Sequence, residues 1–303
     1  MRTAVLKALA TVAIWGCSFL AIRVALEGAT PWGVVWMRST LAAVLLFALL
    51  AARGQPLLPE RRDRARCVVL GLVGATHFLI QTLSMQSTTT LRAGWIIAFI
   101  PVVVALGSRL FLRQRMAALG WAGIALATFG VLVLTSVRPA ELARAGVGDA
   151  LMLASTVTWG SYTLLALGPI SRNGGLRVTA LALGVSVVPT LAVALFQGSW
   201  HAAPSLRPVL ALVFLGACAS ALAMWLFADA VGTLGPERTS SFQYLQPFVT
   251  LVVSFLFLDE PFTAATLVGG PLVLAGVALV QRSKRAPASP PKVAAPPTVP
   301  ERP

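Results

Sequence analysis

The chain has 303 residues, of which 57% are hydrophobic and only 11% are charged, and its formal net charge is +14. So low a charged fraction excludes an ordinary water-soluble domain, in which about a quarter of the residues are charged, and the high hydrophobicity excludes a disordered chain. In a soluble protein the basic charge would favour nucleic acid, but here we expect it to follow the membrane, with no nucleic-acid partner.

Uninterrupted apolar stretches, separated by charges and by Gly and Pro, predict ten membrane-spanning helices. Each approaches the roughly 20 residues that a spanning helix needs. In chain order their expected ranges are 6–26, 32–52, 67–87, 92–112, 116–136, 147–168, 176–197, 207–230, 238–258 and 263–281. The loops between them leave no room for a globular domain, so the function is expected to reside within the membrane.

Lys and Arg side chains concentrate in alternate loops of this plan. Short cytoplasmic loops carry an excess of Lys and Arg, and an N-terminus in the cytoplasm puts most of the 24 basic residues on that side. We therefore predict a multi-pass protein of the cell inner (plasma) membrane with both termini in the cytoplasm. The last segment, 283–303, contains seven prolines and is predicted to be a disordered cytoplasmic tail.

Comparison of the chain with itself reveals an internal repeat. A shift of 146 residues places Pro101 on Pro247, and a shift of 144 places Trp15 on Trp159. The repeat divides the ten spans into two units of five helices. Because five is an odd number, the second unit must lie upside down relative to the first.

The two predicted units cover residues 1–139 and 140–282. The fold class is thus an all-α integral membrane protein, with ten transmembrane helices as two inverted five-helix repeats. Inverted repeats are typical of secondary transporters, in which a site near the membrane midplane is exposed alternately to each side. The alternative is that duplication only built a stable bundle.

The paired units also resemble a known family. Each has an early Trp-Gly pair, a proline within its fourth span, an aromatic-rich stretch after that proline and a final helix with spaced glycines. Over about residues 5–281 these features resemble the EamA-like branch of the drug/metabolite transporter superfamily. The resemblance implies a ten-helix inner-membrane carrier, commonly an exporter of amino acids, related metabolites or drugs. The family's acidic residue after the fourth helix is Glu260 in the second unit but Gln114 in the first.

Polar side chains deep in a membrane span are costly and are therefore candidates for function. His77 lies in the third predicted span, four residues before Gln81, so both side chains share one helical face. A neutral imidazole can hydrogen-bond a substrate carboxylate or amine, or take up a proton. The alternative is a hydrogen bond between helices that stabilises the bundle.

A second candidate group, Gln243, Tyr244 and Gln246, immediately precedes Pro247 in the ninth span. Proline cannot bond the carbonyl four residues back, which here belongs to Gln243. Pro101 has the equivalent position in the first unit. We expect the polar group to bind substrate and both prolines to line the cavity or act as hinges, with simple helix bending as the alternative.

Trp15 and Trp159 occupy equivalent positions inside the first and sixth spans, and Tyr162 follows the second of them. Tryptophans of an interfacial belt would lie nearer the helix ends. These rings are predicted either to pack against the other unit or to form a flat wall for an aromatic or aliphatic substrate.

Arg23, Glu27 and Arg38 are expected in the outer half of the membrane. Because an unpaired charge there is costly, Arg38 is predicted to pair with Glu27 or with backbone carbonyls. The cluster is a candidate outer gate, and the alternative is an ion pair that anchors the helices.

Two other classes of membrane protein, an enzyme and a channel, fit the sequence less well. An enzyme would need paired acids or a nucleophile with a base, and the segment around His77 offers neither. A channel would need a continuous polar pore, for which the spans hold too few polar residues. We therefore predict a secondary carrier of small organic metabolites, with export as the direction that the family resemblance implies. We expect no enzymatic activity, cofactor or metal, and a monomer or homodimer.

Overall fold

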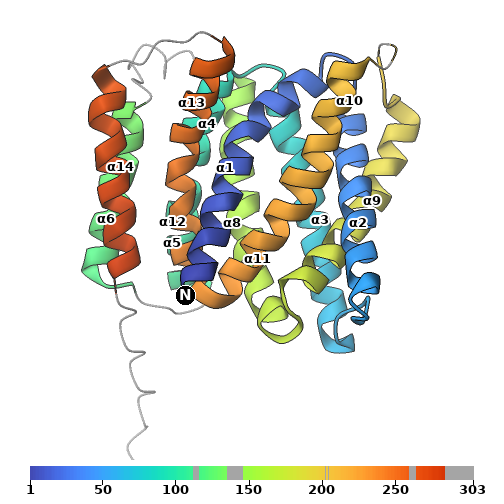
Figure 1. Ribbon diagram of the computed structural model, residues 1–303, viewed down its shortest axis with the longest axis horizontal. Helices are drawn as coiled ribbons and strands as arrows, with labels where there is room; N and C mark the ends of the chain where they lie inside the picture. Colours follow the sequence, from blue (N-terminus) through green and yellow to red (C-terminus); the bar gives the residue numbers. More distant parts are fainter. Residues whose placement is uncertain (112–115, 135–145, 202, 204, 259–263, 284–303) are drawn as a thin grey trace, which may run out of the picture.

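A computed structural model describes the protein except for residues 112–115, 135–145, 202, 204, 259–263 and 284–303. Regular structure in the described ranges is helical apart from isolated bridge residues, among them the antiparallel pair Ala29 and Trp200. The helices stand side by side in a bundle, and the N-terminus lies at one end of it (Figure 1). We call this the N-terminal end. The predicted all-helical class is confirmed over the described residues.

Helices of the first half follow the predicted spans closely. They are α1 (Arg2–Ala25), α2 (Pro31–Ala52), α3 (Arg61–Ser84), α4 (Thr90–Ile97), α5 (Ile100–Phe111) and α6 (Ala118–Leu134). The start of α2 shows how the local sequence sets a boundary. The Thr30 hydroxyl accepts a hydrogen bond from the Gly33 N–H at 3.1 Å, and Pro31 occupies the first helical position.

The second half repeats this order with more irregular segments. Its helices are α8 (Val147–Asn173), α9 (Gly175–Gln197), α10 (Leu206–Val213), the π-helical η1 (Phe214–Leu222), α11 (Ala223–Leu234), α12 (Pro236–Ser241), the 3-10 helix η2 (Phe242–Leu245), α13 (Gln246–Leu258) and α14 (Ala264–Arg282). The segments α10, η1 and α11 follow one another without a break.

The distribution of side chains fits a lipid solvent. Six helical segments of the described chain are long and apolar enough to cross a membrane, by length and composition: 2–25, 31–52, 61–84, 147–173, 175–197 and 206–234. Large apolar side chains face outward, among them Phe196 at 91% exposure and Phe111 at 80%. Polar side chains such as Arg38 and Gln243 are buried, the arrangement expected where the surroundings are hydrocarbon.

The predicted fourth and ninth spans are both interrupted near their prolines. Between α4 and α5 the helix breaks at residues 98–99, just before Pro101. Before Pro247, the chain passes through the 3-10 turn η2. There the structure corrects one expectation: the Gln243 carbonyl is not freed, because the N–H of Gln246 bonds it. A 3-10 turn satisfies a carbonyl that proline leaves without its α-helical partner.

Glycines at repeat-related positions make matching contacts between the halves. A Cβ atom added at Gly16 would meet the side chain of Val249, and one added at Gly160 would lie 2.6 Å from the side chain of Val103. Val103 and Val249 are separated by 146 residues, the same shift that relates the two prolines. Helix α1 therefore packs on α13 in the way that α8 packs on α5.

The pair formed by α6 and α14 has the same symmetry. A Cβ atom at Gly123 would lie 2.7 Å from the carbonyl oxygen of Gly276, and one at Gly130 would lie 3.0 Å from that of Gly269. The shift of 146 residues converts each contact into the other. These glycines let the two backbones approach closely, as small residues do between membrane helices.

Helices α1 and α8, which carry the equivalent tryptophans, run in opposite directions. Asp229 pairs with Lys7, near the start of α1, and lies against Gly175, which follows the end of α8. The start of α1 and the end of α8 therefore lie at the same end of the bundle (Figure 1).

Three of the sequence expectations fall outside the described residues. They concern Gln114, Glu260 and the tail 283–303, of which Ser283 alone is described.

Candidate functional site

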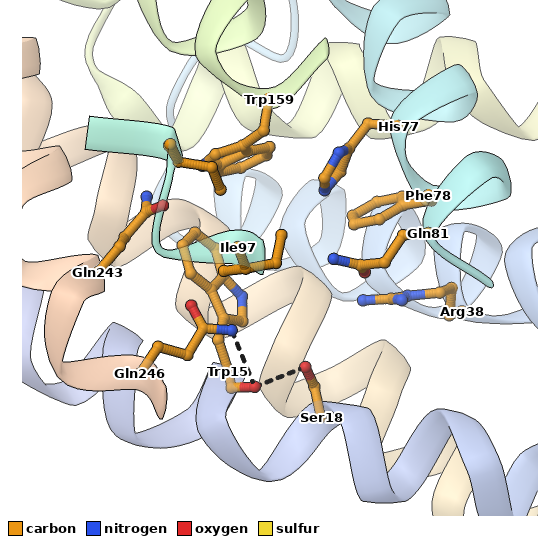
Figure 2. Close-up of a pocket in the computed structure, with 11 residues that line it drawn as sticks. Trp15, Ser18, Arg38, His77, Phe78, Gln81, Ile97, Trp159, Gln243 and Gln246 are labelled. Carbon is orange, nitrogen blue, oxygen red and sulfur yellow. Dashed lines mark hydrogen bonds between the residues drawn. The ribbon is translucent and has the colours of Figure 1, made fainter. Parts of the chain in front are cut away.

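A small cavity lies between helices of both halves and gathers most of the candidate residues. Its volume is about 30 Å³, enough for about one or two water molecules. Figure 2 shows side chains pointing toward it from several helices. The residues that line it are Trp15, Ser18, Arg38, His77, Phe78, Gln81, Ile97, Ile100, Trp159, Gln243 and Gln246.

His77 connects the two halves at the cavity wall. Its Nδ1 lies 3.0 Å from the carbonyl oxygen of Ser155 and 3.3 Å from the hydroxyl of Thr158, both on α8. Because a carbonyl oxygen only accepts, Nδ1 carries the proton in this contact, and the neutral ring keeps Nε2 as its acceptor. His77 thus makes the expected bond between helices and also borders the cavity.

The equivalent tryptophans meet each other. The Trp15 and Trp159 rings are 5.1 Å apart at 88°, an edge-to-face pair, and the ring of Phe227 contacts both. The Trp15 indole N–H donates to the carbonyl of Ala219 in η1 at 2.9 Å. The rings therefore pack across the halves, and both also form part of the cavity wall. Their contact with a substrate stays a prediction.

The two interrupted spans supply chemically different sides of the cavity. Gln243 and Gln246 line it from the second half, and Ile97 and Ile100 line it from the repeat-equivalent positions of the first half. Gln246 Nε2 lies 3.4 Å from the carbonyl oxygen of Trp15. Among the described residues neither amide atom of Gln243 has a hydrogen-bond partner, and its side chain is 1% exposed.

Arg38 does not make the expected contact with Glu27. It is 2% exposed, its Nε donates to the Ser220 hydroxyl at 2.9 Å, and its guanidinium carbon lies 4.1 Å from the centre of the Phe78 ring. Glu27 is exposed and pairs with Arg207 instead, at 3.5 Å. The physical reason is that α2 turns Arg38 toward the polar cavity, where burial of its charge is least costly.

Three further site predictions are not brought into the cavity. Arg23 is exposed on α1. Tyr162 stacks on Trp159 at 5.1 Å and lines a separate small hollow. The Tyr244 hydroxyl lies 2.9 Å from the Thr128 hydroxyl of α6. Tyr244 therefore joins η2 to α6, whereas Tyr162 stacks on a ring of its own helix. Their aromatic character alone gave no indication of which way they face.

Sequence reasoning also missed residues that shape the site. Ser18 and Phe78 line the cavity, and Ser220 holds Arg38 from the π-helical segment η1. The wider turn of a π-helix is common at functional sites. Its sequence, small and apolar, carries no recognisable signal of that conformation.

Ion pairs between helices lie toward both ends of the bundle. At the N-terminal end Lys7 pairs with Asp229 at 2.7 Å, and Asp63 pairs with Arg172. At the opposite end Arg92 pairs with Asp149 at 2.6 Å, and the Thr88 hydroxyl bonds the same carboxylate. Such pairs join α3 and α4 to α8, on either side of the cavity.

Two larger grooves lie elsewhere on the bundle. They are lined almost wholly by apolar side chains such as Leu20, Phe214 and Leu165. Each groove has few polar side chains that could orient a ligand. By contrast, five polar or charged side chains from α2, α3 and the ninth predicted span line the small cavity. The small cavity is therefore the candidate site.

Comparison with protein families agrees with this geometry. The sequence model of the EamA-like transporter family matches residues 2–136 and 146–282. The chain belongs to the EamA-like transporter family. Its duplicated match accounts for the internal repeat, and membership confirms the resemblance noted in the sequence. This EamA-like protein is a multi-pass membrane protein of a transporter family.

Individual relatives extend the comparison. A probable terminal-alkyne amino-acid exporter of Streptantibioticus cattleyicolor is 33% identical over 277 residues, covering 90% of this chain and 91% of the relative. The uncharacterized inner membrane transporter YedA of Escherichia coli K12 is 27% identical and covers 79% of this chain and 78% of its own length. A crystal structure with 18% sequence identity has a TM-score of 0.74 over 92% of this chain and 96% of its own. That likeness shows the shared fold.

Proposed function

We propose that this EamA-like protein is a secondary transporter that moves small organic metabolites through the central cavity by alternating access. The observation that carries the proposal is the cavity's position between repeat-related helices that run in opposite directions, with polar side chains converging on it. Its ten spans would form two inverted five-helix units, 1–139 and 140–282. In inverted-repeat carriers the site lies at the interface between the units.

The proposed orientation places the N-terminal end of the bundle in the cytoplasm of an inner-membrane protein. The excess of Lys and Arg in the loops of that end supports it. We propose amino acids and related metabolites as cargo and export as the direction. One relative that is named as a probable amino-acid exporter supports both.

Pro101 and Pro247 are proposed as hinges, because each stands at an interruption of a helix that also lines the cavity. A break in the i to i+4 ladder lets half-helices move separately, and transporter sites are commonly built from such discontinuous helices. The outer-gate role of Arg23 and Glu27 stays a prediction.

The proposal is tested by untargeted mass spectrometry of the medium of cells that overproduce the protein. We expect at least one small metabolite to be enriched with the wild type and to return toward background with His77→Ala, which removes a cavity-lining ring. The matched control is Thr76→Ala, the neighbouring position on α3, where the side chain is exposed and donates a hydrogen bond to the Leu72 carbonyl.

Both variants are measured at equal amounts of protein in the membrane fraction. Enrichment that survives His77→Ala would remove this residue from the site. If no compound is enriched by the wild type, and liposomes containing it take up none of the tested metabolites with or without a pH gradient, the transport proposal fails.

A further inference from the structure

Arg38 is a buried positive charge for which the described part of the chain offers no acidic partner. The described acidic residues that form ion pairs do so elsewhere: Glu27 with Arg207, Glu60 with Arg62, Asp63 with Arg172, Asp149 with Arg92, and Asp229 with Lys7. The residues that line the cavity include no acid. A charge in the membrane interior without a counter-charge is costly, and such residues mark binding sites and pathways.

The guanidinium is held in position and still has a free donor. Its Nε is fixed by the Ser220 hydroxyl at 2.9 Å, and its plane lies over the Phe78 ring. Among the described residues Nη1 has no hydrogen-bond partner. Figure 2 shows the side chain pointing toward the cavity beside Gln81. A guanidinium fixed in this way presents planar donors that match a carboxylate, and burial strengthens the attraction.

The rest of the cavity suits the other parts of such a molecule. Gln243 offers an unpartnered amide N–H₂ group and carbonyl oxygen, and the His77 ring keeps Nε2 as an acceptor. Ile97 and Ile100 are apolar at the positions equivalent to the two glutamines. The described lining thus has a cationic side, a neutral polar side and an apolar surface, and within it no anionic group is present for a lone cation.

We infer that Arg38 binds the carboxylate of the transported molecule, and that the substrates are small carboxylates with a short apolar body. Amino acids with uncharged side chains belong to this class. This inference rests on the proposed transport function and names the substrate class of the same cavity. Because the cavity now holds about 30 Å³, such a molecule enters only when the surrounding helices move apart.

The test uses liposomes containing the full-length protein and loaded with four related compounds: L-propargylglycine, its carboxamide, its decarboxylated amine and its deaminated acid. Their release is followed by mass spectrometry. We expect the wild type to release the two compounds that have a carboxylate at least about tenfold faster than the amide and the amine. Loss of one partner of a buried charged pair commonly costs that much or more in affinity.

Three variants assign the effect to Arg38. Arg38→Met is expected to lose at least about 90% of carboxylate release, and Arg38→Lys, which keeps the charge without the planar fork, to retain part of it. Arg53→Met, an exposed position at the end of the same helix, is expected to match the wild type.

Thermal unfolding in detergent without added compound separates binding from a structural role. Because the described residues give the Arg38 charge no counter-ion, Arg38→Met is expected to unfold at the same or a higher temperature than the wild type. A lower unfolding temperature together with loss of release would show a structural role and overturn the inference.

The remaining outcomes are also decisive. Release of the amine or amide as fast as the acids, unchanged in Arg38→Met, would overturn the inference while leaving the transport function standing. The inference would be overturned as well if the wild type released none of the four compounds while the same liposomes released a metabolite that was found in the medium experiment and lacks a carboxylate. Failure of the wild type in both experiments would contradict the transport function, and with it this inference.

Discussion

Arg172→Ala is expected to lower the free energy of unfolding by more than the loss of an exposed ion pair would, because it leaves the buried Asp63 carboxylate without its charged partner. The Asp63 carboxylate, 1% exposed, accepts hydrogen bonds from Arg172 and from the Asn173 amide at 2.8 Å. Without Arg172, the buried Asp63 carboxylate would still accept the hydrogen bond from the Asn173 amide and would still lie in the first turn of α3, but its ion pair would be lost. The free energy of unfolding is measured by denaturant titration in detergent.

The companion variants make this expectation specific. Asp63→Asn combined with Arg172→Ala removes both charges and is expected to recover most of the lost stability. Arg62→Ala, which breaks the exposed pair with Glu60 at 2.8 Å, is expected to change it by less than about 0.5 kcal/mol. Equal effects of Arg172→Ala and Arg62→Ala, or no recovery in the double variant, would contradict the importance of this contact.

Gln243→Leu is expected to lower transport at least about tenfold without lowering stability. Both amide atoms of Gln243 are without a partner among the described residues, and the side chain is 1% exposed. A buried unsatisfied polar group costs roughly 1–3 kcal/mol, so an apolar side chain of similar size relieves the ligand-free protein. A substrate that normally bonds the amide would lose that contact, which explains the loss of rate.

A second glutamine provides the control for this variant. The Gln281 amide donates to the Arg238 carbonyl at 2.8 Å and to the Ser241 hydroxyl at 2.9 Å. Gln281→Leu is therefore expected to lower the unfolding temperature while the protein that remains folded transports at the normal rate. Normal transport by Gln243→Leu would remove this residue from the proposed site. Both variants are compared by initial rate of substrate release from liposomes at equal protein content.

The sequence was most informative where it repeats itself. The self-comparison related Pro101 to Pro247 and Trp15 to Trp159, and in the structure the tryptophans are in contact and both prolines stand at helix interruptions. Repetition constrains the fold strongly, because two copies of one unit must present complementary surfaces to each other. His77 was found for another reason, its cost in an apolar span.

The sequence did not predict which face of each helix points toward the cavity, because this depends on how the helix is rotated about its own axis. Tyr162 and Tyr244 lie close to cavity residues in sequence, yet neither lines the cavity. Tyr162 stacks on Trp159 of its own helix, and the Tyr244 hydroxyl contacts Thr128 of α6. Arg38 was predicted to pair with Glu27 or with backbone carbonyls, whereas its partner is the Ser220 side chain, 182 positions away in a π-helical segment. Such orientations depend on tertiary packing and on long-range pairing, which local spacing does not determine.

Ion pairs at both ends of the bundle suggest how opening would proceed. The contact of Asp63 with Arg172 joins the start of α3 to the end of α8. At the opposite end of the bundle, the contacts of Asp149 with Thr88 and Arg92 join the start of α8 to the segment that leads into α4 and to α4 itself. In an alternating carrier one set of contacts must break while the other holds. Each conformation would then open the cavity to one side only.

The most direct measurement of alternating access is the reactivity of a cysteine placed in the cavity. In a protein whose native Cys17, Cys67 and Cys218 are replaced by serine, the cavity-lining residue Ser18 is replaced by cysteine (Ser18→Cys). This variant is treated with a membrane-impermeant thiol reagent in right-side-out and inside-out vesicles. Reaction is expected from both sides, each protected by a transported substrate, while the vesicles stay impermeable to ions. Reaction from one side only, or reaction from both sides accompanied by a continuous ion leak, would contradict the carrier mechanism.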